Sequence, residues 1–276
     1  MCRGGTMIKL IAIDIDDTLV NTKKEITEHV KESVQKASAA GVKIVLTTGR
    51  PIMGVKSYLK TLGLDDMDDQ YVISYNGSVV ETTSGKLIAA QEVGYPAYAR
   101  MTELGNEWGV LVQTEMLEDI YTTAHDINPM ASRESYFMGM PIKVRELTEM
   151  PADGEYVKVM VIAESDEIDA VQKKLPADIT DNYTVVRSDQ YFLEVINKEA
   201  SKGNGLTTLA KHLGISMDET MAIGDQQNDM SMVEVAGFGV SMGNGIPELK
   251  QIADAVTTTQ DEDGVGVAID KYVLDN

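Results

Sequence analysis

Apolar runs and helical segments alternate over the first part of the chain. Residues 8–15 are rich in Ile and Leu and predict a buried strand, and residues 42–49 and 70–77 predict two more. Helices are predicted between these strands, over residues 27–40 and 51–63. The order strand, helix, strand, helix, strand, with apolar strands, indicates a parallel sheet that helices cover on both faces.

The ends of the two helices carry recognisable signals. Thr27 is placed as the N-cap of the first helix, and Gly41 stands where that helix should stop. Pro51 suits the first turn of the second helix, and Gly63 suits its end. These residues therefore support the predicted boundaries.

The pattern changes after the third strand. Residues 78–93 predict a hairpin that turns at Ser84-Gly85. The strands beyond it alternate or carry aromatic residues, which is typical of an antiparallel sheet with one open face. We expect these strands in residues 108–124, 155–164 and 182–196, with helices near residues 96–107 and 166–174.

The first pattern returns in the last part of the chain. Helices are predicted at 202–214, 227–237, 246–253 and 263–273, and strands at 220–225, 238–243 and 254–259. A core that an inserted domain divides explains this order. We expect core segments at residues 7–83 and 198–276, an α+β insertion at 84–197, and a leader or disordered segment at 1–6.

Composition narrows the choice of partners. The chain has 276 residues and a net charge of −20, which disfavours nucleic acid and anionic membranes, since both need a basic face. Its one cysteine, Cys2, excludes an internal disulfide and a cysteine-based metal site, and it fits a reducing cytoplasm. No run of 18 apolar residues is present, so we expect no membrane span.

Four polar clusters lie at or beside the predicted carboxyl ends of core strands, where parallel sheets form their sites. Taken singly, each has an ordinary explanation: a solvated turn, a turn with its N-cap, or a surface lysine. Their joint appearance on matching elements is what these explanations do not account for. The clusters are Asp14-x-Asp16, Thr47-Thr48-Gly49-Arg50, Lys202-Gly203 and Gly224-Asp225-x-x-Asn228-Asp229.

The aspartates of these clusters suit a hard cation. Asp14 and Asp16 are separated by one residue, so one can offer a side-chain oxygen and the other its backbone carbonyl. Asp225 adds an oxygen from another strand. A set of oxygen ligands without His or Cys is typical of Mg²⁺, which keeps water and a substrate phosphate in its shell.

The motifs "DIDDT", "TTGR", "SKG" and "GDQQND" resemble the four motifs of the haloacid dehalogenase superfamily. The "SYNG" that closes the third strand and the large insertion between the second and third motifs make the chain similar to the Cof-type sugar-phosphate phosphatases of that superfamily. The resemblance covers about residues 7–276. It implies an α/β fold with a Rossmann-like three-layer core and parallel sheet, plus an inserted α+β cap domain.

The resemblance also implies a role for each motif residue. Asp14 would be the nucleophile that forms an aspartyl-phosphate, and Asp16 would be the general acid and base. The other implied roles are Mg²⁺ binding for Asp14, Asp16 (by its carbonyl) and Asp225, phosphate binding for Thr48, Gly49, Lys202 and Asn228, and orientation of the metal shell for Asp229.

Two motif positions leave a question open. Arg50 could guide the anion into the site or have a surface or structural role. Asp17 stands where many members of the superfamily have Gly, which we interpret as a tolerated variant.

The inserted domain is expected to act as a lid that excludes water and contacts the non-phosphate part of the substrate. Met130, Arg133, Tyr136 and Met138 could line a cleft there, although Met and aromatic residues more often belong to a core. The three histidines, His29, His125 and His212, fall in no motif.

The leading hypothesis is therefore a Mg²⁺-dependent phosphatase of small phosphorylated metabolites such as sugar phosphates; a flavin or pyridoxal phosphate is also open as substrate. Three alternatives stay open: a phosphomutase on the same scaffold, a non-enzymatic phospho-acceptor domain, and an inactive metabolite-binding protein. A phosphomutase would require a bisphosphate activator. Phospho-acceptor domains lack a large insertion and a turn like "GDQQND", and this chain has both. We expect a monomer or a homodimer.

Overall fold

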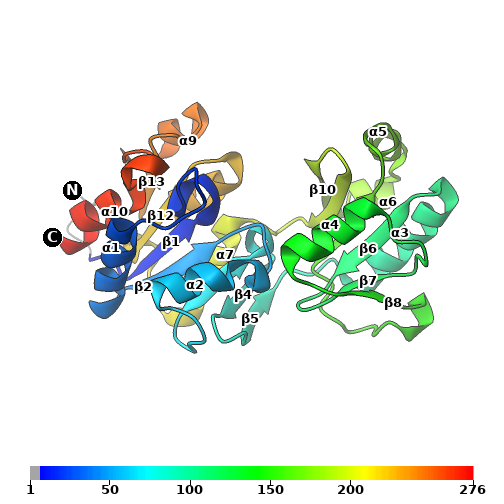
Figure 1. Ribbon diagram of the computed structural model, residues 1–276, viewed down its shortest axis with the longest axis horizontal. Helices are drawn as coiled ribbons and strands as arrows, with labels where there is room; N and C mark the ends of the chain where they lie inside the picture. Colours follow the sequence, from blue (N-terminus) through cyan, green and yellow to red (C-terminus); the bar gives the residue numbers. More distant parts are fainter. Residues whose placement is uncertain (1–6, 276) are drawn as a thin grey trace. The chain divides into compact units, whose positions relative to one another are not determined.

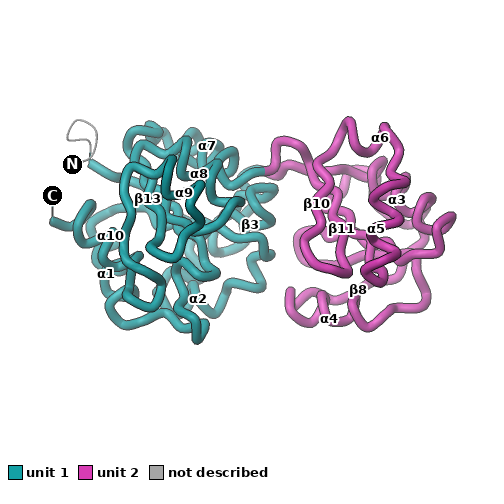
Figure 2. The backbone as a smooth tube through the Cα atoms, turned by 90° about the horizontal axis from the view of Figure 1, so that it is seen from above, with its two compact units in different colours: residues 1–89, 201–276 teal, residues 90–200 magenta. Residues whose placement is uncertain are grey.

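The chain forms two compact units in a computed structural model that describes residues 7–275 (Figure 2). Unit 1 takes the chain up to Ala89 and again from Ser201 onward, and unit 2 is Ala90–Ala200. The boundaries expected at residues 84 and 197 lie a few residues before these; the first differs because the hairpin that follows residue 78 continues the sheet of unit 1. The predicted leader, residues 1–6, lies outside the described residues.

Unit 1 is built on a sheet of eight strands in the order β14-β13-β12-β1-β2-β3-β4-β5. Its strands from β14 to β3 are parallel, as the sequence predicts, and β4 pairs antiparallel with β3. The bounds are β1 (Leu10–Asp14), β2 (Lys43–Thr47), β3 (Tyr71–Ser74), β4 (Val79–Thr82), β5 (Leu87–Ala90), β12 (Thr220–Gly224), β13 (Phe238–Ser241) and β14 (Ala255–Val256).

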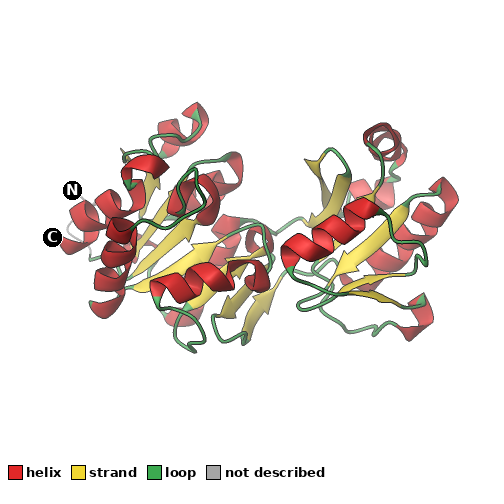
Figure 3. Ribbon diagram, in the orientation of Figure 1, coloured by secondary structure: helices red, strands yellow, loops and turns green. Residues whose placement is uncertain are grey.

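Helices cover both faces of this sheet, which gives the predicted three-layer core (Figures 1 and 3). One face packs on α1 (Glu28–Ala39), α2 (Lys56–Leu62) and α10 (Gly264–Ile269). The other packs on α7 (Lys202–Leu213), α8 (Met230–Val235) and α9 (Pro247–Ile252). Except for the edge strands β5 and β14, the strands are buried on both sides, which explains the apolar runs of β1, β2 and β3.

Several predicted ends agree with the structure, and others do not; the helix predicted from Pro51, for example, starts with a 3₁₀ turn, so that α2 begins at Lys56. The Thr27 side chain caps α1 by accepting a hydrogen bond from the Val30 N–H, and Gly63 ends α2 with φ of 74°. The helix predicted from residue 227 starts with a 3₁₀ turn, so that α8 begins only at Met230. The last predicted strand is reduced to Ala255–Val256, because only these residues pair with β13.

Unit 2 contains a sheet of six strands in the order β10-β11-β9-β6-β7-β8. Neighbouring strands are antiparallel except β7 and β8. The bounds are β6 (Leu111–Glu115), β7 (Ile120–Thr122), β8 (Ile142–Val144), β9 (Lys158–Ile162), β10 (Tyr183–Asp189) and β11 (Phe192–Asn197).

The helices of unit 2 lie on both faces of its sheet. On one face α3 (Gly94–Trp108), α5 (Ser165–Lys174) and α6 (Ala177–Thr180) form the main core with the strands. The face expected to be open is covered in part by α4 (Pro129–Met138), whose Ala131 is buried in a smaller apolar cluster. Among residues 7–275, no helix combines the length and the apolar character needed to cross a membrane.

A buried charge cluster lies on the α4 side of the unit 2 sheet. Lys158 of β9 has its Nζ 3.2 Å from Glu115 Oε1 and 3.3 Å from Glu194 Oε1. Glu134 of α4 also faces this lysine. One ammonium group therefore faces three carboxylates. Burial raises the pKa of Glu115 to about 7, although the charge of Lys158 lowers it in part.

Replacing Glu115 with Gln should stabilise unit 2 at pH 8. The Glu115 pKa is raised on folding, so the folded protein binds a proton there more readily than the unfolded chain does. The free energy of unfolding therefore falls as the pH rises from about 4.5 to about 7. Glu115→Gln removes that loss and should add roughly 1–3 kcal/mol at pH 8, because one pKa unit is worth about 1.4 kcal/mol. Urea unfolding at pH 8 and at pH 5 measures the gain.

The gain should be near zero at pH 5, where the Glu115 carboxyl is already protonated in the folded state. Glu118→Gln, at an exposed position of the same unit, should leave the stability unchanged at both pH values. An equal effect of Glu115→Gln at pH 5 and pH 8 would show that the burial of its charge is not the cause.

Candidate active site

Strand geometry gathers the motif residues of unit 1. Asp14 is the last residue of β1, Thr48 directly follows β2, and Asp225 directly follows β12. Because β1 pairs in parallel with both β2 and β12, these three carboxyl ends lie at one edge of the sheet. Lys202 is the first residue of α7, after the N-cap Ser201.

The centre of the site is a buried ion cluster. Lys202 Nζ lies 2.5 Å from Asp14 Oδ1 and 2.6 Å from Asp229 Oδ1, and its side chain is fully buried. The second oxygen of Asp229 accepts hydrogen bonds of 2.9 Å from the N–H groups of Asp225 and Gln226. Asp229 thus has both oxygens engaged by donors of the chain, and it fixes Lys202 and the Asp225 backbone in place.

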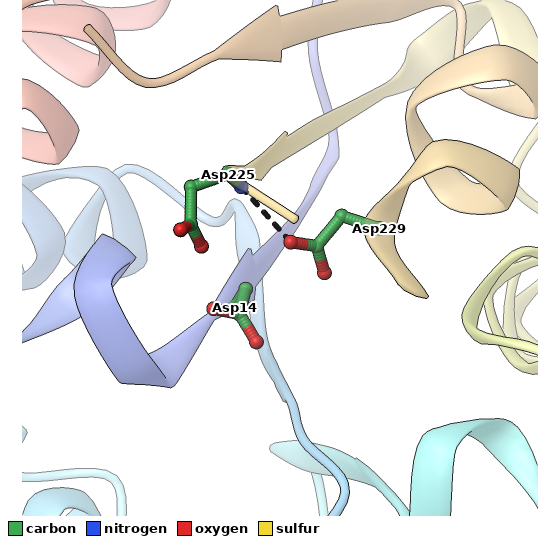
Figure 4. Close-up of side chains that lie close together, drawn as sticks. All are labelled: Asp14, Asp225 and Asp229. Atoms are coloured by element: carbon green, nitrogen blue, oxygen red, sulfur yellow. Dashed lines mark hydrogen bonds between the residues drawn. The ribbon is translucent and has the colours of Figure 1, made fainter. Parts of the chain in front are cut away.

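One carboxylate oxygen of Asp225 accepts no hydrogen bond from the described residues. Asp225 Oδ1 accepts a hydrogen bond of 2.9 Å from the Thr18 hydroxyl, while its Oδ2 is buried and accepts none from the described residues. Figure 4 shows the carboxyl groups of Asp14, Asp225 and Asp229 turned toward one another, and one oxygen of each lies within 4.8 Å of the others. Such a group of carboxylates could hold a metal ion.

The electrostatics agree with a cation site. Burial raises the pKa of Asp14 to about 7, against the lowering effect of Lys202, and the neighbouring Asp229 adds to the rise. Burial likewise raises the pKa of Asp225 to about 6. The cluster is short of positive charge, and its oxygen donors suit a hard divalent cation, so the residues fit the metal that their sequence pattern implies.

Asp16 lies apart from these carboxylates. Its half-exposed side chain is not a member of the three-carboxylate group. Asp16 Oδ1 accepts a hydrogen bond of 2.7 Å from Arg50 Nη2 and lies 3.2 Å from Lys24 Nζ. The structure therefore pairs Arg50 with Asp16.

A second polar group joins Thr48, Gly49 and Asn228 through Asn76. The Asn76 N–H donates to the Thr48 carbonyl at 2.8 Å, and Asn228 Nδ2 donates to Asn76 Oδ1 at 3.1 Å. A Cβ at Gly49 would lie 3.1 Å from Asn76 Nδ2, so a glycine here lets the amide approach the backbone. Thr47 differs from Thr48, because its hydroxyl is turned into the core toward Met232.

Four side chains around the site were not identified from the sequence. Asn76 follows the third parallel strand, so the carboxyl-end rule could have identified it. Thr18 belongs to the "DIDDT" motif, although no role was assigned to it. Lys24 and Asn244 gave no signal, because each reaches the site only through the folding of its loop. Their partners are Asp225 for Thr18, Asp16 and Asp17 for Lys24, and the Asp17 carbonyl for Asn244.

The backbone explains the unusual Asp17. Its φ of 58° lies in the left-handed region, which Gly enters freely and Asp tolerates better than most residues. Many members of the superfamily that the motifs resemble have Gly at this position. Asp17 can adopt the same left-handed conformation and so keeps the turn.

The candidate recognition residues of unit 2 all lie on α4. Met130 lines a cavity of about 320 Å³ with Asn128 and Ile162. Arg133 is held by Asp189 at 3.1 Å and lies over the rings of two aromatic residues. Tyr136 is exposed, as is its neighbour Phe137. Tyr136 is thus outside the core, whereas Arg133 is already engaged within unit 2.

The chain is similar to known proteins over almost its whole length. A family model described as haloacid dehalogenase-like hydrolase matches residues 11–269. The curated protein named "Putative phosphatase YxeH", from Bacillus subtilis, is 41% identical over 97% of this chain and 99% of its own. A crystal structure of a haloacid dehalogenase-like hydrolase from Bacteroides thetaiotaomicron has a TM-score of 0.83 at 29% identity, over 96% of this chain and 99% of that one. The HAD subclass IIB sugar phosphatase BT4131 has a TM-score of 0.73 at 26% identity, over 96% and 98%.

Proposed function

Because the chain belongs to the haloacid dehalogenase-like hydrolase family, we propose that it is a Mg²⁺-dependent phosphatase of small phosphorylated metabolites. Its general activity, hydrolysis of phosphoric monoesters, follows from the family and from relatives named as phosphatases. Sugar phosphates are the first substrate class to consider, since BT4131 is named a sugar phosphatase. The observation that carries the mechanism is the buried cluster in which Lys202 holds Asp14 while an Asp225 oxygen stays free.

The metal ligands in this proposal are the side chains of Asp14 and Asp225 and the backbone carbonyl of Asp16. Mg²⁺ bound there would offset the negative charge of the substrate phosphate, which otherwise repels an anionic nucleophile. Asp229 takes no part as a ligand, because both of its oxygens already accept hydrogen bonds. It orients Lys202 and Asp225 instead.

Asp14 is the proposed nucleophile. Lys202 holds one of its oxygens, and the other attacks phosphorus in line with the leaving alcohol. The bond from phosphorus to the alcohol oxygen breaks as the bond to Asp14 forms, which gives an aspartyl-phosphate. Water then attacks this phosphorus, and inorganic phosphate leaves with Asp14 restored.

Asp16 is the proposed proton carrier for both steps. It gives a proton to the leaving alcohol and takes one from the attacking water. Support comes from its position outside the three-carboxylate group, since a carboxylate bound side-on to a cation could not also carry the proton. Arg50 and Lys24 both donate hydrogen bonds to Asp16 Oδ1, and these bonds hold the side chain outside the three-carboxylate group.

The phosphoryl oxygens need donors beside the nucleophile. We assign this to the Lys202 ammonium, the Thr48 hydroxyl, the backbone at Gly49 and the Asn228 amide, which Asn76 orients. Unit 2 is the proposed cap that recognises the rest of the substrate, and the exposed Tyr136 is its first candidate contact.

Removal of divalent ions should abolish hydrolysis of p-nitrophenyl phosphate. Without a cation the cluster holds three carboxylates against one ammonium group, so the anionic substrate is repelled. We expect turnover to fall at least about 100-fold in EDTA and to return when Mg²⁺ is added in excess, because the cation supplies several kcal/mol of charge stabilisation. Full activity after exhaustive treatment with EDTA would reject the metal-dependent mechanism.

The substrate class is tested on a panel of phosphorylated sugars, flavin precursors and pyridoxal phosphate, with Mg²⁺ present and released phosphate as the readout. A sugar phosphate should give the largest kcat/KM. If a sugar phosphate is instead converted to its isomer, and only when a sugar bisphosphate is added, the protein is a phosphomutase.

A further inference from the structure

Asn244 connects the loop after β13 to the turn that follows Asp14. Its Nδ2 donates a hydrogen bond of 2.8 Å to the Asp17 carbonyl, across 227 positions of sequence. Its Oδ1 accepts one of 3.1 Å from the Gln260 N–H. The amide is therefore held at both ends, so its orientation toward Asp17 is fixed.

The turn that Asn244 contacts carries two groups of the site. Asp16 is extended, with φ of −74° and ψ of 125°, and Asp17 bends the chain with φ of 58°. Thr18, the next residue, directs its hydroxyl to Asp225. A change of conformation at Asp17 would therefore move the Asp16 carbonyl and the Thr18 hydroxyl together.

The turn around Asp17 is closed by the Val20 N–H, which donates to the Ile15 carbonyl at 3.1 Å, but the side chain of Asp17 adds little support. Its carboxylate lies 3.4 Å from Lys24 Nζ, but both side chains are half exposed, and such surface pairs contribute little. A left-handed residue other than Gly is unfavourable unless its surroundings hold it. The hydrogen bond from Asn244 acts directly on the backbone of this residue.

The same loop also fixes the backbone of Asp225. The Ile246 N–H donates to the Asp225 carbonyl at 2.9 Å, and the Met242 N–H donates to the Gly224 carbonyl at 2.9 Å. Gly245 closes the loop so tightly that a Cβ there would lie 2.5 Å from Ser241 Oγ. Residues 241–246 thus bind both segments that supply the proposed metal ligands.

We infer that Asn244 is a positioning residue of the metal site. It holds the Asp16–Thr18 turn against the segment of Asp225, so that carbonyl and carboxylate ligands stay in register. The inference rests on the proposed function, because it assumes that a divalent ion binds between these segments. Replacing a residue that orients metal ligands typically costs about 10- to 100-fold in metal affinity or activity.

The test uses Mn²⁺ binding to the full chain, followed by electron paramagnetic resonance, beside thermal melting in EDTA. Asn244→Ala and Asn244→Asp should weaken Mn²⁺ binding about 10- to 100-fold, since neither side chain can donate to the Asp17 carbonyl. The Mg²⁺ concentration for half-maximal hydrolysis should rise by a similar factor. Asn182→Ala, which removes a comparable amide bond to the Asp178 carbonyl in unit 2, should change neither.

The outcomes separate this inference from the proposed function. If the unaltered chain binds no Mn²⁺, the metal site itself is wrong, and the inference is lost with it. If the unaltered chain binds Mn²⁺ and both Asn244 variants bind it equally well, only the positioning role is overturned. A lower melting temperature in EDTA with unchanged Mn²⁺ affinity would assign Asn244 a purely structural role and overturn it too.

A second variant checks that Asn244 acts through the conformation of Asp17. Gly enters the left-handed region without strain, so Asp17→Gly should reduce the effect of Asn244→Ala on Mn²⁺ affinity to about threefold or less. An equally large effect of Asn244→Ala in both backgrounds would contradict the proposed route.

Discussion

Asp14→Asn is expected to lower turnover of p-nitrophenyl phosphate by about 10⁴- to 10⁶-fold, the range seen when a nucleophile is removed. Asn keeps the size of Asp14 and its contact with Lys202, but the amide cannot form the acyl-phosphate. The measurement is steady-state hydrolysis at saturating Mg²⁺, with rapid quenching and mass spectrometry of the protein to detect phosphate on residue 14.

The stability of this variant separates lost chemistry from lost folding. Burial raises the pKa of Asp14 to about 7, so its charge opposes folding above that pH in the absence of a cation. Asp14→Asn should therefore be at least as stable as the unaltered chain at pH 8 in EDTA. Asp126→Asn, at an exposed site in unit 2, should keep full activity. If Asp14→Asn retains ordinary turnover, another residue is the nucleophile.

Lys202→Met is expected to lose both activity and stability. The ammonium group contacts Asp14 and Asp229 and is fully buried, so its removal leaves one buried oxygen of each carboxylate without its cationic partner. Breaking such a group costs about 3–5 kcal/mol of folding free energy. Turnover should fall about 10³-fold or more, which corresponds to about 4 kcal/mol. The loss of stability should be smaller at pH 5, where the carboxylates can take up protons.

Lys158→Met is the matched control for this prediction. Lys158 is also buried and also serves several carboxylates, but it lies in unit 2 outside the proposed catalytic group. Its replacement should destabilise the protein to a similar degree while the folded fraction keeps its turnover of p-nitrophenyl phosphate. If both lysine variants lose turnover to the same extent, the effect of Lys202 is one of stability alone.

The fold could be predicted well where burial decides the pattern. The strands beginning at Leu10, Lys43 and Tyr71 are covered on both faces, and their apolar runs alone identify them. The α4 helix was missed because only Ala131 and Glu134 of its residues are buried, so its sequence shows little apolar period. Its start at Asn128-Pro129 did carry a capping signal that could have been used.

The site could be predicted as far as strand ends determine it. Asp14 is the last residue of β1 and Asp225 directly follows β12, so the sheet brings them together once β1 and β12 are parallel neighbours. The side chain of Asp16 could not be placed in this way, because its contacts with Arg50 and Lys24 depend on how two loops fold.

The contact of Asn244 with Asp17 could not be predicted from sequence patterns. Its partner, the Asp17 carbonyl, is a backbone atom whose direction is set by one left-handed residue. Backbone carbonyls are present at every position, so no residue type marks the one that will be bound. Only the three-dimensional path of the two loops reveals the pair.

The most direct test is a crystal structure of the protein grown with Mn²⁺ in place of Mg²⁺, with an anomalous difference map that locates the ion. We expect one strong peak between Asp14 and Asp225, about 2.2 Å from an oxygen of each carboxylate, with Lys202 still bound to Asp14. A map without a peak there, or with the ion bound elsewhere on the chain, would contradict the proposal that these two aspartates share a catalytic cation.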